Sequence, residues 1–449
     1  MKISKLLCLL ISIVLVIAIP SVSAYAEEGN QESEITVILN DVMVSFDQPP
    51  VMMLERVLVP IRAIFEKLNY EVLWDEETQT ATSTKDDRKI TVQIDNPVIK
   101  YSKNNQEYEY LCDVVPTTLS DRTMVPVRAI AECAGCEVVW SESKNAVYIL
   151  SRFSDEKYVP DGSVVATVNG VEITDKALNY FVYQQASDFY NKCAALINNP
   201  FAFNWDKTTF DDIVTKDYII NKALEDVAKN IIYIEAGLDA GLEFREELQI
   251  EQIDVMLSQE SDEYVNALVK SLAIVDKEEF ISLDIMLAKS RNVREDIYTN
   301  PTKFYPENSE VLADYTDDII VSAKHILVAD GEGEEILKLI KKGEGFDKLI
   351  KEYNQDPGQG EGGYTFGKGE MVKEFEDAAF ALKINEISGV VKTNYGEHII
   401  KRIAGFEELT NYWMSQAEIK TTKVIDKISV NDIIVDAAIA QIQLEDMDV

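Results

Sequence analysis

The sequence has little histidine and little positive charge, and it lacks long apolar runs after its first 26 residues. Its 449 residues include 2 histidines, and 43 lysines and arginines stand against 79 aspartates and glutamates, a net charge of −36. Such an acidic surface repels nucleic acid and anionic membranes, so neither is an expected partner. Without a later apolar run the chain is not a multi-spanning membrane protein. Hydrophobic residues at 46% and charged residues at 27% are typical of a globular chain, and the length suggests about three domains.

The first 26 residues predict a secretory signal peptide. Lys2 and Lys5 precede an apolar run over residues 6–19, and small residues follow it. Ala24 and Ala26 each end an acceptable cleavage site. We therefore expect an exported protein of the extracellular space or cell envelope, with retention of the segment as an anchor as the alternative.

Four cysteines remain once this segment is removed. Cys133-Ala-Gly-Cys136 has the spacing of a metal or redox pair, but no second pair and no nearby histidine completes a zinc site. We expect no metal here. A structural disulfide, with Cys112 as one partner, is plausible in an exported protein, and buried free thiols, with Cys193 among them, are the alternative.

An internal repeat with an offset of 66 residues occupies the N-terminal part. Leu58-Val-Pro-Ile-Arg-Ala-Ile-Phe-Glu66 returns as Met124-Val-Pro-Val-Arg-Ala-Ile-Ala-Glu132, and Trp74 returns as Trp140. Each copy indicates a strand, a short helix that begins after a proline, and a strand that ends in tryptophan. Because each helix is short and its apolar face needs a sheet to cover it, we expect the two copies to share one core.

Two further regions follow a polar bridge at residues 151–163. Residues 164–174 predict a strand that turns at Asn169-Gly170, and amphipathic helices extend from there to about residue 300, with Ile219, Ala223, Val227 and Ile231 on one face. From residue 318 the pattern becomes a small α+β unit: a strand at 319–328, helices at 334–342, 346–353 and 375–382, a glycine-rich loop at 357–363, and a closing hairpin at 390–403.

Both histidines of the chain lie in strands of this C-terminal unit. An isolated histidine in a strand is usually a structural residue, so each one alone carries little information. The occurrence of His325 and His398 in similar surroundings within one small domain, and nowhere else, favours a shared site.

The repeat resembles the N-terminal domain named after copper amine oxidases, which serves as a stalk in exported proteins of Gram-positive bacteria. Copper needs several imidazole ligands, and the repeat segment contains no histidine. We therefore interpret it as a spacer or as a module that binds a cell-wall component, and exclude amine oxidation.

The C-terminal unit resembles the parvulin-type peptidyl-prolyl isomerases in four phrases that keep their order and spacing. They are Ala323-Lys-His-Ile-Leu327, Asp356-Pro-Gly358 leading to Gly362-Gly363, Gly369-Glu-Met-Val-Lys-Glu-Phe-Glu-Asp-Ala-Ala-Phe380 and Val391-Lys-Thr-Asn-Tyr-Gly-Glu-His-Ile-Ile400. The phrase Val168-Asn-Gly-Val-Glu-Ile-Thr174 is similar to the start of the helical chaperone region in secretion foldases of the PrsA and SurA type.

The resemblance implies a set of site residues. It assigns catalytic roles to His325, Asp356, Thr393 and His398, and it assigns the proline-binding pocket to Met371, Phe375 and Phe380. One departure is clear, because Gly363-Tyr-Thr-Phe-Gly367 is about two residues shorter than the family's phrase at this place. An alternative interpretation makes the polar set purely structural and gives catalysis to the shape of the pocket.

We expect a multidomain α+β protein in which a repeated small α/β stalk module precedes a helical chaperone region and a parvulin domain. The expected division is a signal peptide at 1–26, the stalk at 33–152, the helical region at 160–315, the parvulin domain at 318–404 and a C-terminal segment at 405–449 that packs on the helical region. The expected function is isomerisation of X–Pro bonds in exported, unfolded polypeptides, without phospho-specificity and without a cofactor. The alternatives are a non-catalytic envelope protein with the parvulin unit as scaffold, and a client-specific chaperone whose isomerase is dispensable.

Overall fold

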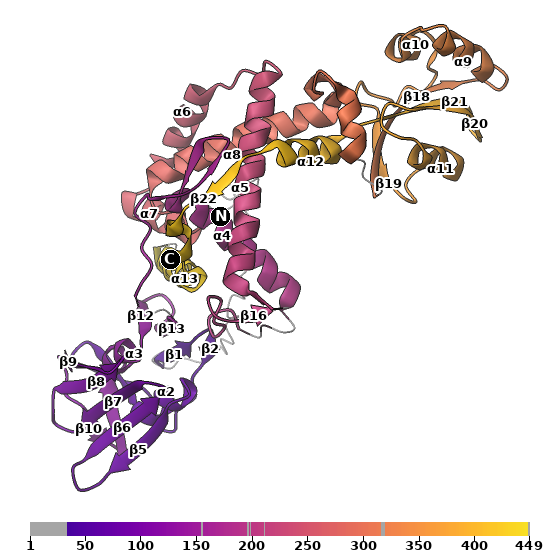
Figure 1. The fold of residues 1–449 in the computed structure, drawn as a ribbon. Coiled ribbons are helices and arrows are strands. Elements are labelled where there is room, and N and C mark those ends of the chain that lie inside the picture. Colours follow the sequence, from indigo (N-terminus) through magenta and orange to yellow (C-terminus); the bar gives the residue numbers. More distant parts are fainter. Residues whose placement is uncertain are drawn as a thin grey trace.

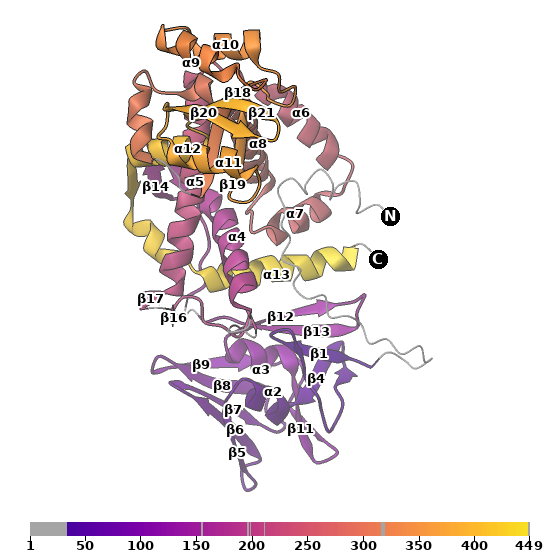
Figure 2. The ribbon, with the colours of Figure 1, turned by 90° about the vertical axis from the view of Figure 1, so that its right-hand side faces the viewer.

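The computed structural model describes residues 34–153, 156–194, 197, 199–210, 212–315 and 319–447; the expected signal peptide lies outside these ranges. The molecule is elongated, with a β-rich part at one end, helices in the middle and a second α+β unit at the other end (Figure 1, Figure 2). The expected fold class, multidomain α+β, is confirmed. Among the described residues, no helix is both long and apolar enough to span a membrane.

The β-rich end contains both copies of the repeat. Three sheets, in the orders β12-β13-β1-β2, β10-β11-β4-β3 and β5-β6-β7-β8-β9, surround two short helices. The elements are β1 (Thr36–Leu39), β2 (Val42–Met43), β3 (Val51–Met53), β4 (Arg56–Pro60), α2 (Ile61–Lys67), β5 (Glu71–Asp75), β6 (Thr80–Lys85), β7 (Arg88–Gln93), β8 (Val98–Lys103), β9 (Gln106–Leu111), β10 (Thr117–Leu119), β11 (Arg122–Pro126), α3 (Val127–Cys133), β12 (Cys136–Ser141) and β13 (Ala146–Ser151).

The two copies are joined by matching contacts. Arg56 of the first copy pairs with Asp113 at 2.5 Å, and Arg122, the equivalent of Arg56, pairs with Asp47, the equivalent of Asp113, also at 2.5 Å. Both pairs are exposed, so each contributes little to stability. They show the register in which the two copies meet. One buried hydrophobic cluster holds residues of both copies, including Ile64 and Ile130 at equivalent positions.

The four cysteines that fall within the described ranges are free thiols. Cys112, Cys133 and Cys136 are buried in the shared core of the repeat, where burial raises their pKa values to about 11, 12 and 11. A thiol that stays protonated in an apolar core is a poor nucleophile. Of the two interpretations left open by the sequence, free thiols are the one that the structure contains for these four cysteines; Cys193, however, is half-buried rather than buried.

The sheet β12-β13-β1-β2 is covered on both faces. Alternate residues of β13, such as Val147 and Ile149, enter the core of the repeat, whereas Tyr148 and Leu150 enter the core of the helical part. Since side chains alternate between the two faces of a strand, one sheet serves both cores. The β-rich end is therefore continuous with the helices rather than tethered to them.

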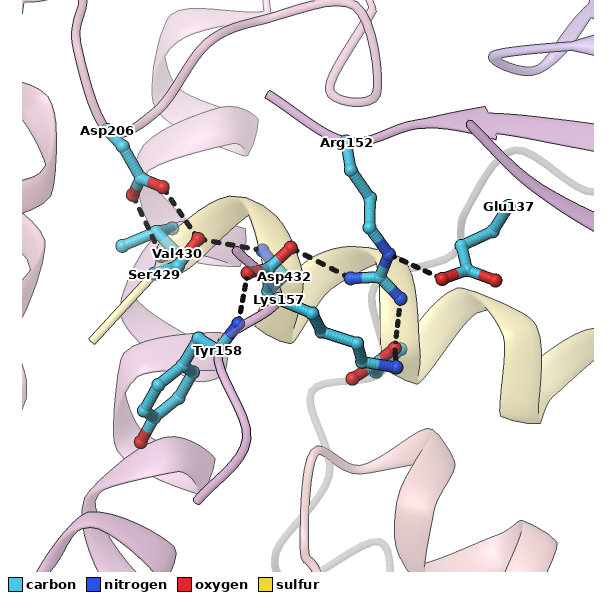
Figure 3. Close-up of polar contacts among 9 residues, drawn as sticks. Glu137, Arg152, Lys157, Tyr158, Asp206, Ser429, Val430 and Asp432 are labelled. Atoms are coloured by element: carbon cyan, nitrogen blue, oxygen red, sulfur yellow. Dashed lines mark hydrogen bonds and ion pairs between the residues drawn. The ribbon is translucent and has the colours of Figure 1, made fainter. Parts of the chain in front are cut away.

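A buried ion-pair network reinforces this junction (Figure 3). The guanidinium of Arg152, just after β13, contacts Glu137 of β12 at 2.8 Å and Asp432 of α13 (Val430–Met447) at 2.8 Å, and also pairs with Asp436. The side chain of Arg152 is 8% exposed and that of Asp432 is fully buried. The backbone N–H of Tyr158 donates to the other oxygen of Asp432 at 2.7 Å. Arg152 and Tyr158, in the bridge after the repeat, are thus held against α13, the last helix among the described residues.

The helical middle is built from two distant parts of the sequence. It comprises β14 (Val164–Val168), β15 (Val171–Thr174), α4 (Asp175–Cys193), β16 (Thr209–Phe210), β17 (Ile213–Val214), α5 (Thr215–Asp239), α6 (Glu246–Leu257), α7 (Asp262–Ser271), α8 (Lys277–Thr299), the 3-10 helices η1 (Pro301–Phe304) and η2 (Ser309–Tyr315), and from the C-terminal part α12 (Phe406–Gln416), β22 (Ile419–Thr421), the 3-10 helix η3 (Lys423–Lys427) and α13 (Val430–Met447). β22 adds a third strand to β14 and β15, and α13 packs on α7 and α4.

The apolar face expected for α5 is correct, because Ile219, Ala223, Val227 and Ile231 are all buried. The short β16–β17 hairpin before α5 was not anticipated, because each of its strands has only two residues and carries no periodic signal.

The second α+β unit is one antiparallel sheet with helices on both faces (Figure 1). Its strand order is β19-β18-β21-β20, and its elements are β18 (Ile320–Val328), α9 (Gly333–Lys341), α10 (Phe346–Tyr353), β19 (Tyr364–Gly367), α11 (Lys373–Ala381), β20 (Ile387–Thr393) and β21 (Gly396–Ile403). Two small cores result, one under α9 and α10 and one under α11. β19 was missed by the sequence analysis, which described residues 363–367 only as a shortened phrase and predicted no strand there.

This unit packs against the helical part at the end of α8. Tyr305, just after η1, donates its hydroxyl to the carbonyl oxygen of Ala404, directly after β21, at 2.9 Å. Gly362 of the glycine-rich loop lies so close to the last turn of α8 that an added Cβ would be 2.6 Å from the carbonyl oxygen of Thr299. Glycine is therefore required at this contact for steric reasons.

Candidate active site

His325 and His398 lie side by side on one face of the sheet. β18 and β21 are antiparallel with His325 opposite Ile400 and His398 opposite Leu327, so the two histidines are diagonal neighbours. Their ring centroids are 5.0 Å apart, and both residues are buried. Phe375 of α11 contacts both rings edge-on, at 5.2 and 5.3 Å. The sheet therefore builds a compact aromatic centre from three distant segments.

Asp356 reaches this centre from the loop after α10. Its Oδ2 lies 3.2 Å from Nε2 of His325, and its Oδ1 accepts the backbone N–H of Gly358 at 2.8 Å. Asn354, at the end of α10, accepts the N–H of Leu327 at 2.9 Å and thereby ties this loop to β18. The carboxylate is thus held at a fixed place beside the imidazole.

Thr393, at the end of β20, completes the polar set. Its Oγ1 is 2.8 Å from Nε2 of His398 and accepts the backbone N–H of Tyr395 at 3.1 Å. His325, Asp356, His398 and Thr393 therefore lie together as two linked pairs.

The electrostatics of the site favour neutral imidazoles. Burial lowers the pKa of His325 to about 4, with a further lowering by His398, although the nearby Asp356 carboxylate acts in the opposite direction. Burial also lowers the pKa of His398. Both rings are thus uncharged at neutral pH, because desolvation outweighs the attraction of the carboxylate. The site presents fixed dipoles rather than a charged acid–base pair.

The expected proline pocket lies beside the histidines. Phe375 is 3% exposed in the core under α11, and Met371 and Phe380 pack against that core while remaining partly accessible. Phe366 of β19 belongs to the same cluster, with its ring centroid 5.8 Å from that of Phe375 and 6.1 Å from that of Phe380. The sequence analysis missed Phe366, although Tyr364 and Phe366 alternate as residues on one face of a strand do.

The glycine-rich loop is fastened to the backbone of His325 by a side chain that the sequence analysis also missed. Gln359 Oε1 accepts the N–H of His325 at 2.7 Å, and its Nε2 donates to the carbonyl oxygen of His325 at 2.9 Å. β19 pairs with β18 only as far as Ala323, so Gln359 supplies the hydrogen bonds that a longer strand would supply. Gly363 has φ +73°, and an added Cβ would lie 2.4 Å from the carbonyl oxygen of Ala323.

Within the described residues, no group of three or more His, Cys, Asp or Glu side chains is placed to hold a metal ion. The chemistry that this arrangement supports is recognition of a small apolar ring next to a polar backbone group, with neutral hydrogen-bonding partners. Such a site suits a reaction in which no covalent bond is broken.

Comparison with known proteins agrees with this interpretation. Residues 307–404 match the model of the PPIC-type PPIase domain, and residues 38–149 and 102–183 match the copper amine oxidase N-terminal domain. The foldase protein PrsA of Geobacillus sp. (strain WCH70) is 31% identical over 266 residues, which cover 54% of this chain and 87% of that protein. PrsA of Caldanaerobacter subterraneus is 32% identical over 255 residues, 55% of this chain and 76% of the relative. For PrsA of Geobacillus kaustophilus the match spans 66% of the relative at 33% identity.

Two solved structures are also similar to parts of this chain. The parvulin NmPin of Nitrosopumilus maritimus is 41% identical, with 20% of this chain and 100% of that chain covered and a TM-score of 0.19. PrsA from Bacillus subtilis is 24% identical, with 57% and 86% covered and a TM-score of 0.20.

The sheet, its helices and the matched domain define a peptidyl-prolyl cis–trans isomerase of the parvulin type. The matches outside that domain carry the assignment further, and the chain belongs to the PrsA foldase family.

Proposed function

We propose that this protein assists the folding of exported polypeptides by isomerising their X–Pro bonds at the site around His325 and His398. In this proposal His325, Asp356, Thr393 and His398 form the polar side of the site, and Met371, Phe375 and Phe380 hold the proline ring. The observation that carries the proposal is the pair of buried, neutral histidines in contact with Phe375, directly beside an apolar cluster.

The chemistry of X–Pro rotation fits such a site. Rotation about a peptide bond crosses a barrier of roughly 18–20 kcal/mol because twisting breaks the amide resonance. The enzyme has to bind the twisted imide better than either planar form. An apolar pocket holds the ring while the preceding carbonyl rotates, and the neutral polar groups respond to the carbonyl as it loses conjugation. No nucleophile, metal or cofactor takes part.

Two other accounts of the same site make different predictions. If the polar set is only structural, its conservative substitution lowers stability and leaves turnover unchanged. If the parvulin unit is an inactive scaffold, the protein has no isomerase activity at all, and the helical middle alone binds clients.

The expected substrates are unphosphorylated. Recognition of a phosphate before proline needs arginine or lysine beside the site. Residues 329–335, which form the loop after β18 and the first turn of α9, instead carry Asp330, Glu332, Glu334 and Glu335. Such a loop repels phosphate, so neutral or basic residues before proline should be preferred.

The direct test is the rate of cis–trans exchange in X–Pro peptides with the full mature chain. Acceleration of unphosphorylated peptides supports the proposal. Absence of acceleration would reject isomerisation, and a clear preference for phosphoserine-proline peptides would reject the substrate assignment.

We further propose export to the extracellular space or cell envelope, with residues 1–26 as the signal peptide. The division proposed for the rest is a stalk at 33–152, a helical region at 160–315, the isomerase at 318–404 and a C-terminal segment at 405–449. This division is supported by the sheets, because every strand of the stalk sheets and of the isomerase sheet lies within the corresponding range. We propose that the helical middle binds the unfolded client polypeptides.

For the stalk we propose a neutral glycan of the cell wall as ligand. A groove of about 1030 Å³ opens between the two copies, and Trp74, which is 39% exposed, lines it. Its repeat equivalent, Trp140, packs against the shared core instead. The groove around Trp74 is lined by side chains of both charge signs, including Arg62 and Glu66 of α2. An accessible indole ring offers a flat apolar surface for a sugar ring, and balanced charges favour an uncharged ligand.

This second proposal is tested by sedimentation of the protein with purified cell-wall glycan. Trp74→Ala should abolish binding, whereas Leu73→Ala should not, because Leu73 is the adjacent exposed residue and points to the opposite face of β5. Equal binding by both variants would reject the groove as the site.

A further inference from the structure

Tyr364, the first residue of β19, touches two members of the polar set at once. Its hydroxyl donates to Asp356 Oδ2 at 2.9 Å. Its ring stacks on that of His325, with centroids 5.8 Å apart and planes inclined by 17°. The same Asp356 oxygen lies 3.2 Å from Nε2 of His325. Tyr364 therefore belongs to a closed three-membered arrangement with the carboxylate and the imidazole.

These contacts fix the orientation of the carboxylate. Oδ1 is held by the N–H of Gly358, and Oδ2 by the phenol of Tyr364, so the Asp356 side chain has no freedom to turn away from His325. Gly358 also leaves room for the phenol, because a Cβ at this position would be 2.7 Å from the tyrosine oxygen.

A fixed carboxylate in turn fixes the proton of His325. A carboxylate accepts hydrogen bonds and does not donate them, so the imidazole nitrogen that faces it carries the proton in the neutral ring. His325 is then the Nε2–H tautomer, with Nδ1 left as the acceptor of the ring. Both ring nitrogens are buried, and neither makes an aligned hydrogen bond with the described residues; the 3.2 Å between Nε2 and Asp356 Oδ2 is a close contact that places this nitrogen against the carboxylate. The groups that face Asp356 are Tyr364 from β19, His325 from β18 and, at longer range, His398 from β21.

We propose that Tyr364 is a positioning residue of the isomerase, whose phenol holds Asp356 against His325 and thereby selects the tautomer of His325. The inference rests on the roles proposed above for these two residues. The phenol stays a donor at every physiological pH, because burial and the Asp356 carboxylate raise its pKa to about 12. A purely packing role for the ring is the competing explanation, since Tyr364 also contacts the core under α11.

Tyr364→Phe separates the two explanations, because it keeps the ring and removes only the hydroxyl. In the full chain we expect kcat to fall roughly ten-fold, the range for loss of one hydrogen bond to a charged group. KM should stay within about two-fold, because the apolar pocket is untouched. Nitrogen-15 spectra should change from a single His325 tautomer protonated at Nε2 to a mixture. Tyr353→Phe, which removes the hydroxyl of an exposed tyrosine on α10, is the matched control and should change neither quantity.

Wild-type kcat together with an unchanged His325 tautomer in Tyr364→Phe would overturn the inference. If that variant loses its fold, the tautomer of His325 in the wild type still decides, because protonation at Nδ1 contradicts the proposed arrangement. The spectra also separate the two proposals: a wild-type chain without isomerase activity would reject the function, while the tautomer would still test Tyr364.

Discussion

Val59 and Val125 lie opposite each other in the antiparallel pair of strands β4 and β11, and they are the same position in the two copies of the repeat. On either side of this pair, Pro60 lies opposite Met124 and Leu58 lies opposite Pro126. Leu58 is equivalent to Met124 and Pro60 to Pro126 in the repeat, so the two pairs are the same contact made twice. A local two-fold axis therefore passes between the two valines. The copies face each other as the halves of a symmetric dimer do, within one chain.

This symmetry predicts that neither copy folds alone. Residues 33–152 should unfold in one cooperative transition, and a chain that ends near residue 100 should stay unfolded. The truncation removes β11 from beside β4 and β13 from beside β1, so Val59 loses Val125 and Ile38 loses Tyr148 as strand partners. Circular dichroism during thermal unfolding tests this, and a cooperative transition in the shorter chain would contradict it.

Copper should neither bind tightly to the repeat nor stabilise it. The segment contains no histidine, and its Cys133 and Cys136 thiols are buried with raised pKa values. Differential scanning calorimetry with and without copper checks this. A large rise in melting temperature that depends on copper would show that the segment does hold the metal.

Stability should fall in acid because of the histidine pair. The pKa of His325 decreases from 6.5 in the unfolded chain to about 4 in the folded protein. Between these two pH values the unfolded state therefore binds more protons than the folded state. The contribution of His325 to the free energy of unfolding has its full value above pH 6.5 and decreases as the pH falls towards 4. For His325 the effect corresponds to about 3 kcal/mol.

Urea unfolding at several pH values measures this dependence. Carboxylates also titrate in this range, so the comparison is with His325→Gln, which should show a shallower loss between pH 6.5 and 4. An identical slope in the two proteins would contradict the assignment.

Substitutions in the polar set should separate folding from turnover. His325→Ala and His398→Ala remove buried strand residues and should cost about 2 kcal/mol or more of stability as well as activity. Asp356→Ala should lower turnover with a smaller loss of stability, because Asp356 is on a loop and its side chain is 20% exposed. Thermal unfolding measured beside exchange kinetics decides, and full activity in the Asp356 variant would reject its role.

The junction network gives the last prediction. Arg152→Ala deprives the buried Asp432 of its guanidinium, and breaking a buried pair from one side costs about 3–5 kcal/mol. Lys157→Ala is the control, since its pair with Asp436 is more than 40% exposed on both sides and should contribute at most about 1 kcal/mol. Equal unfolding free energies of the two variants would mean that the network does not hold the junction.

The sequence predicted the features that have local signals. The two strand histidines, the amphipathic face of α5 and the prolines before α2 and α3 all carry such signals, and the structure agrees with each. The missed features depend on contacts that no local pattern records. Gln359 hydrogen-bonds to the backbone of His325 in place of a strand partner. This partner is missing because β19 pairs with β18 only as far as Ala323.

The junction could not be predicted for a related reason. Arg152 and Asp432 are 280 residues apart, so nothing near Arg152 in the sequence indicates which carboxylate it meets. The sequence analysis also treated the repeat as separate from the helices. The residues of β13 are apolar on both faces of the strand, but the sequence does not indicate which element covers the second face.

The arrangement of β14 between β15 and β22 has a consequence for the order in which the chain acquires its structure. A polypeptide that emerges from its N-terminus completes the repeat once β13 is out, and the isomerase sheet once β21 is out. The helical middle begins with β14 but has to wait for β22 and α13, the last described elements of the chain. The part proposed to cradle other unfolded chains is thus the last part of this protein to finish its own folding.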